Sequence, residues 1–130
     1  MIDQPAARTL QYSPRPHFIP FHQRSTRYAC MVCHRRAGKT VAAVNECVIR
    51  ALYTQKDNAR YAYIAPFRQQ AKEVAWLYLK EAARPFINSE KDIRESELRV
   101  RLFNGAWISL YGSDNPDALR GIYLDGVIID

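Results

Sequence analysis

The sequence of 130 residues lacks the features of membrane-spanning, secreted or repetitive proteins. No apolar run approaches the ~18 residues that a membrane helix needs, and the first residues lack the basic and then apolar blocks of a signal peptide. The three cysteines are odd in number and lie in strand-like or helix-like text, so we expect a reducing compartment. The chain also has no internal repeat and no low-complexity tract. These absences favour a cytoplasmic protein with no membrane partner.

The composition indicates a small globular protein with a basic surplus. A chain of this length can hold one domain with a modest core, and 48% hydrophobic residues suit that class. Nineteen basic against thirteen acidic side chains give a formal net charge of +6 and a sequence pI near 9.4. Such a surplus suggests an anionic partner, although an ordinary solvated surface can carry it too.

The most informative stretch runs from Cys33 to Thr40 and ends in Gly-Lys-Thr. The apolar residues 28–33 before it predict a buried strand. After it, apolar side chains recur at the spacing of a helix: Val41, Val44, Val48, Ala51 and Leu52. Strand, tight loop and helix form the context of a P-loop, although Cys33 stands where the full pattern has its first Gly.

A P-loop assigns a role to each residue of this tripeptide. Backbone N–H groups and the positive end of the helix converge on phosphates. Lys39 would reach the β- and γ-phosphates of ATP, and the Thr40 hydroxyl would ligate Mg²⁺. Gly38 lets the backbone turn and approach the nucleotide without a Cβ clash.

The remaining pattern predicts an α/β fold, with a largely parallel sheet flanked by helices. Residues 1–26 carry four of the seven prolines, so we expect an irregular lead-in there and, over 27–130, the N-terminal part of a P-loop ATPase domain. The elements expected after the P-loop helix are a strand at 61–65 stopped by Pro66, a helix at 67–84, an exposed connection at 88–97, a hairpin of 98–103 with 106–111 around Asn104-Gly105, a short helix or turn at 116–121, and a buried strand at 126–130.

Asp130 is the second chemical anchor, because an apolar strand that ends in Asp is typical of a Walker B motif. Its carboxylate would hold the Mg²⁺ that Thr40 also ligates. The plainer alternative is a strand-terminal Asp that caps a turn. The Glu that usually follows and orients the attacking water is not in the sequence, so we expect a P-loop fold that is incomplete at the C-terminus.

Four segments in this order resemble the N-terminal ATPase domain of the large terminase subunits of tailed phages. The segments are His34–Thr40, Tyr63–Ala71, Gly112–Gly121 and Val127–Asp130, and the resemblance ends inside Walker B. It implies an ATP-hydrolysing motor subunit that packages double-stranded DNA in the cytoplasm of the host cell. Expected partners are a portal protein and a small terminase subunit, and the active form would be a homo-oligomeric ring.

The resemblance also implies roles for single residues. Arg35 would touch the γ-phosphate and act in catalysis with Lys39 and Asp130. Gln23 would read the edge of adenine. The other residues implied in nucleotide binding are those of the loop: His34, Arg36, Ala37, Gly38 and Thr40. Arg120 could reach a phosphate, a neighbouring subunit or DNA.

Other readings stay open beside this one. The protein could be another helicase-like P-loop ATPase acting on nucleic acid, or a catalytically inactive nucleotide-binding remnant. Cys30, Cys33 and His34 do not form a convincing metal site, because the two cysteines of an extended strand point to opposite faces. A basic stripe on the second helix reads as a solvated face for all but Arg68; its members are Arg68, Lys72, Lys80 and Arg84.

Overall fold

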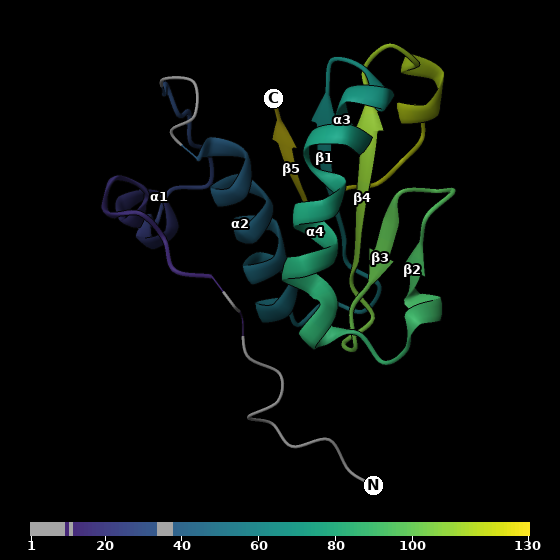
Figure 1. The fold of residues 1–130 in the computed structure, drawn as a ribbon, viewed down its shortest axis with the longest axis horizontal. Coiled ribbons are helices and arrows are strands. Elements are labelled where there is room, and N and C mark those ends of the chain that lie inside the picture. The colour runs from purple at the N-terminus through teal and green to yellow at the C-terminus, as the bar shows by residue number, and fades with distance from the viewer. Residues whose placement is uncertain (1–9, 11, 34–37) are drawn as a thin grey trace, which may run out of the picture.

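The computed structural model describes residues 10, 12–33 and 38–130, which build a mixed α/β fold around one five-stranded sheet (Figure 1). The strand order is β2-β3-β4-β1-β5. The strands are β1 (Arg60–Ala65), β2 (Ile93–Arg94), β3 (Arg99–Arg101), β4 (Trp107–Gly112) and β5 (Gly126–Ile129). The central strand β1 pairs in parallel with β4 and β5, whereas β2, β3 and β4 pair antiparallel. The predicted α/β fold with a parallel core is therefore confirmed.

Three helices pack on one face of this sheet, as Figure 1 shows. They are α2 (Lys39–Tyr53), α3 (Arg68–Val74) and α4 (Trp76–Ala83). The core between these helices and the sheet contains Val44 and Val48 of α2, Leu79 of α4, and Ile108 and Leu110 of β4. Because the apolar side chains of α2 recur at helical spacing, they form one continuous buried stripe against the sheet.

The short elements of the described residues are one helix and four 3₁₀ turns: η2 (Pro16–Phe18), α1 (Ile19–Gln23), η3 (Arg84–Phe86), η4 (Glu90–Asp92) and η5 (Pro116–Leu119). The stretch from η2 to α1 lies in the Pro-rich lead-in and buries Phe18. The division of the chain at residue 26 stays a prediction. Among the described residues, no helix has the length and apolar character needed to cross a membrane.

The predicted hairpin is present, and its turn is tied to α2. Leu102 N–H donates to the Ala106 carbonyl at 2.8 Å, which closes the turn around Asn104 and Gly105. The Asn104 amide donates to the Ala51 carbonyl at 2.8 Å, near the end of α2. Asn104 therefore satisfies a carbonyl that a helix C-terminus leaves without an intrahelical partner.

Two elements differ from the pattern-based expectation in the middle of the chain. The helix expected over 67–84 is two helices that meet at Ala75, whose backbone is helical at φ −104° and ψ −25° but departs from ideal values. No Pro or Gly marks this break. The connection at 88–97 contains η4 and β2, and β2 pairs with β3. A strand of two residues is too short for an alternating pattern to reveal it.

The expected strand at 28–33 is wrong for this structure, because these residues form no strand. Tyr28 is 78% exposed and Val32 is 95% exposed. The closing strand β5 is present, but it pairs on one side only, with β1. The expectation of a buried strand is therefore wrong, since Val127 is 47% and Ile129 is 77% exposed.

Candidate nucleotide-binding site

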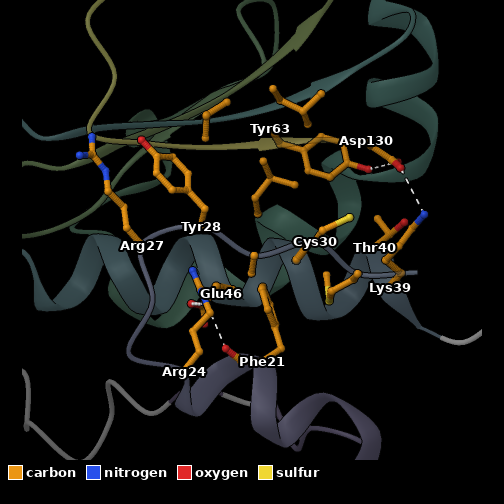
Figure 2. A pocket seen from close by; sticks show the side chains of 16 residues that line it. Phe21, Arg24, Arg27, Tyr28, Cys30, Lys39, Thr40, Glu46, Tyr63 and Asp130 are labelled. Atoms are coloured by element: carbon orange, nitrogen blue, oxygen red, sulfur yellow. Dashed lines mark hydrogen bonds and ion pairs between the residues drawn. The ribbon is translucent and has the colours of Figure 1, made fainter. Parts of the chain in front are cut away.

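A cavity of about 330 Å³ lies where the N-terminus of α2 meets the carboxyl end of β5 (Figure 2). Residues 28–31 are among its lining residues. Lys39, Thr40 and Asp130 are all among its lining residues. Ligands of open α/β sheets bind outside the carboxyl ends of parallel strands, so this is the edge where a nucleotide is expected.

Gly38 starts α2 with a backbone that other residues rarely adopt. Its φ is +93°, in the left-handed region, and it occupies the N-cap position. A Cβ at this position would lie 3.3 Å from the guanidinium carbon of Arg15. The sequence did not single out Arg15, which comes from the lead-in. The turn places Lys39 and Thr40 in the first helical turn, where free N–H groups and the helix dipole favour an anion.

The Lys39 ammonium lies 3.6 Å from the Asp130 Oδ1 atom, so the two sequence-predicted anchors meet. Both side chains are partly exposed to the cavity. The backbone of Asp130 is held in register, because its N–H donates to the Ile64 carbonyl at 2.9 Å. The 91 positions that separate these residues in sequence are thus bridged by the pairing of β5 with β1.

Tyr63 of β1 joins the same group, although the sequence assigned it no role beyond its place at the start of the segment Tyr63–Ala71. Its hydroxyl donates to Asp130 Oδ2 at 2.5 Å, and the Thr40 side chain lines the same cavity. Figure 2 shows Tyr63, Asp130, Thr40 and Lys39 gathered at one end of the cavity. Burial raises the pKa of Tyr63 well above its ordinary value, and the Asp130 carboxylate raises it further.

Glu46 lies at the other end of the cavity, where it anchors the lead-in to α2. Its carboxylate accepts from His22 Nδ1 at 2.8 Å, from Arg24 at 2.6 Å and from Arg50 at 2.8 Å. Burial alone would raise the pKa of Glu46, but these hydrogen bonds outweigh it and hold the pKa below its ordinary value. His22 Nε2 in turn meets the Tyr12 hydroxyl at 2.7 Å. A weak sequence signal is present here, since Asn45 and Glu46 are the polar residues in an otherwise apolar stretch of α2.

Several predicted residues are not brought into the cavity. Gln23 is exposed and is not among the lining residues, whereas its neighbours Phe21 and Arg24 are. Arg120 is exposed and pairs with Asp117 at 3.4 Å. Arg68 donates to the Ser96 carbonyl at 2.8 Å. The loop residues His34, Arg35, Arg36 and Ala37 lie outside the described part of the chain.

The oxygen atoms at this site fit a hard divalent cation. Within 12–33 and 38–130, no three His, Cys, Asp or Glu side chains cluster as a zinc site would require. Thr40 and Asp130 instead offer one hydroxyl and one carboxylate to the same cavity, where Asp130 also accepts from the Tyr63 hydroxyl. Mg²⁺ is commonly bound through one or two protein oxygens together with water and substrate phosphates. The residues present therefore fit Mg²⁺.

Neither the protein-family models nor the curated proteins compared with the chain gave a match. Among solved structures, the chain is similar to the large terminase ATPase domain of Thermus phage P74-26, with a TM-score of 0.66 and 22% sequence identity. The chain has the fold of a large-terminase ATPase domain. The match covers 93% of this chain and 54% of that structure, so the chain spans about half of the terminase ATPase structure.

Proposed function

We propose that the chain is the ATPase part of a DNA-packaging motor subunit of the large-terminase type, and that the cavity beside α2 binds Mg·ATP. The observation that carries this proposal is the convergence of Lys39, Thr40 and Asp130 at the N-terminus of a helix and the carboxyl end of a parallel strand. A turn-capping Asp130 would not need a lysine and a threonine of a distant helix as neighbours.

Each residue has a role in this proposal. The Lys39 ammonium exchanges its contact with Asp130 for the β- and γ-phosphates of ATP. The first N–H groups of α2 and the loop residues His34, Arg35, Arg36, Ala37 and Gly38 hold the phosphates. Thr40 and Asp130 hold Mg²⁺, which when bound neutralises phosphate charge. Arg35 stabilises charge on the γ-phosphate, and Gln23 contacts adenine only if its side chain turns into the cavity.

Two alternatives use the same three anchors. A helicase-like P-loop ATPase would bind Mg·ATP in the same way, and a remnant would bind it without turnover. The likeness to a terminase ATPase domain along 93% of the chain favours the packaging motor over the first alternative. A packaging role would place the protein in the cytoplasm of the host cell, with a portal protein and a small terminase subunit as partners and a homo-oligomeric ring as the active form.

A basic surface on the antiparallel edge of the sheet supports double-stranded DNA as the partner. Three guanidinium groups surround the Trp107 ring, those of Arg94, Arg99 and Arg101, at 5.4, 4.5 and 5.5 Å from its centroid. Glu97 pairs with Arg94 and Arg99 but leaves a positive surplus. Phosphate contacts of this kind give binding that weakens as salt rises, so Arg101→Ala should lower both the affinity for DNA and its salt slope.

Calorimetry with a non-hydrolysable ATP analogue and Mg²⁺ tests the nucleotide site. Lys39→Ala should abolish binding while leaving the fold intact, because the Lys39 side chain faces the cavity and is 42% exposed. Lys91→Ala, on an exposed lysine of η4, is the matched control and should bind as the wild type does. Equal affinity of Lys39→Ala and wild type would refute the proposal.

A further inference from the structure

We infer that the three arginines around Trp107 clamp the phosphates of a DNA backbone, and that Glu97 holds the place of a phosphate until DNA binds. The arginines are Arg94 of β2 and Arg99 and Arg101 of β3; together they are called the arginine clamp. The inference rests on the proposed function and adds two roles to it. Trp107 is a positioning residue that spaces the guanidinium groups, and Glu97 closes the clamp in the free protein.

The pairing of the strands places the arginine clamp on one face of the sheet. Arg94 lies opposite Arg99 in the β2–β3 pair, and Arg101 lies opposite Trp107 in the β3–β4 pair. Val100, which separates Arg99 from Arg101, is buried in the core, so its two neighbours point away from the helices. Like charges directly opposite one another destabilise a sheet, and a bound anion would relieve this repulsion.

The Trp107 ring lies among the three guanidinium groups. The guanidinium carbon of Arg99 is 4.5 Å from the ring centroid, and those of Arg94 and Arg101 are 5.4 and 5.5 Å from it. An aromatic ring attracts cations at such distances, so it offsets part of their mutual repulsion without neutralising their charge. Trp107 therefore gathers three positive charges that remain available to an anionic ligand.

One carboxylate bridges two of these arginines in the free protein. Glu97 Oε1 lies 2.8 Å from a terminal nitrogen of Arg99, and Glu97 Oε2 accepts from Arg94 at 3.4 Å. An anion whose oxygens meet guanidinium groups in this way occupies the position that a phosphate would take. Glu97 is 45% exposed, so water screens both ion pairs and a phosphate can displace the carboxylate at little cost.

Arg99 also carries a donor that has no acceptor. Its Nε atom is buried and has no hydrogen-bond partner in the part of the chain that the structure describes. A cavity of about 170 Å³ lies beside Arg99 and Trp107, and Arg60 and Ser109 also line it. None of the described residues that line this cavity is acidic. Because buried polar groups are normally paired, a free donor at a basic cavity points to an oxygen atom of an anionic ligand.

Fluorescence anisotropy of a labelled DNA duplex, titrated with the full chain at several salt concentrations, tests the role of Glu97. Glu97→Gln should raise the affinity and steepen the slope of log affinity against log salt by about one, because no carboxylate then has to be displaced. Glu81→Gln is the matched control, since it makes the same change of charge at an exposed position of α4, on the other face of the sheet. It should leave the slope unchanged, and equal slopes for the two variants would overturn the role of Glu97.

Variants of Trp107 test the spacing of the arginine clamp without a change of charge. Trp107→Leu removes the aromatic face and should lower the affinity for the duplex about fivefold, whereas Trp107→Phe keeps such a face and should stay within about twofold of wild type. Circular dichroism of both variants checks that the sheet is retained. Equal affinities of folded Trp107→Leu and Trp107→Phe would refute the positioning role.

Two competitors of the duplex distinguish the sources of the anion. Unlabelled duplex should displace the labelled duplex far better than inorganic triphosphate or poly-glutamate at the same concentration of charge. Equal competition by either of them would overturn the assignment to a DNA backbone. In each of these cases binding of Mg·nucleotide at Lys39 is unaffected, so the nucleotide site of the proposed function stands. Absence of duplex binding by wild type that still binds Mg·nucleotide would overturn this inference and the proposed DNA partner, but not the nucleotide site.

Discussion

Replacing Glu46 by Gln should destabilise the fold by about 2–3 kcal/mol, because this carboxylate is buried and joins the lead-in to α2. Glu46 is 5% exposed, and its partners His22 and Arg24 are 11% and 19% exposed. A hydrogen bond to a charged group contributes about 1.5–3 kcal/mol, and Gln retains one acceptor of the two that His22 and Arg24 use. Arg50 is 45% exposed, so its pair with Glu46 adds only about 0.3–0.5 kcal/mol.

Urea unfolding followed by tryptophan fluorescence measures this difference, and in a thermal scan it corresponds to roughly 8–12 °C. Glu90→Gln is the matched control. Glu90 accepts two hydrogen bonds from Arg84 but is 73% exposed, so its replacement should cost at most about 0.5 kcal/mol. If Glu46→Gln were no more destabilising than Glu90→Gln, the buried network would not anchor the lead-in and the reasoning would fail.

Three further outcomes follow from the same structure. Because the folded pKa of Glu46 is lowered, its contribution to the free energy of unfolding is present above its unfolded pKa of ~4.3 and is lost as pH falls below that value. Unfolding measured at several pH values should therefore show the free energies of unfolding of wild type and Glu46→Gln converging in acid. Asn104→Ala should lower the free energy of unfolding by about 1–2 kcal/mol in urea titrations, since it leaves the Ala51 carbonyl without its donor, and a change below the error would contradict that role. Burial raises the pKa of the Cys47 thiol to about 12, so a thiol reagent should label exposed Cys30 and spare Cys47 in the folded protein, and equal labelling would contradict the packing.

Local sequence patterns predicted most of the helices and strands. The apolar spacing after Thr40 predicted α2, and the Asn104-Gly105 turn predicted the hairpin, because each signal lies within one element and its cap. The partial exposure of β5 and the absence of a strand at 28–33 could not be predicted in this way. Whether a segment is a buried strand depends on which strands pair with it, and in this structure β5 pairs with β1 alone.

The candidate site was predicted in part, for a related reason. Lys39, Thr40 and Asp130 belong to motifs that can be read along the chain. Tyr63 begins the segment Tyr63–Ala71, but the sequence gives it no role there, because its contact with Asp130 arises from the register that sets it opposite Ile128, two residues before Asp130. Glu46 was missed because two of its partners, His22 and Arg24, come from the lead-in, which carries no periodic pattern.

Hydrogen–deuterium exchange with and without a Mg²⁺-bound, non-hydrolysable ATP analogue tests the central claim most directly, because it reports where the ligand binds. The account predicts added protection at the N-terminus of α2, over Lys39–Ala42, and at the carboxyl end of β5, over Ile128–Asp130. It also predicts no added protection at the antiparallel edge around Trp107. Protection confined to that edge, or none anywhere at saturating analogue, would contradict the claim that the cavity beside α2 is a nucleotide site.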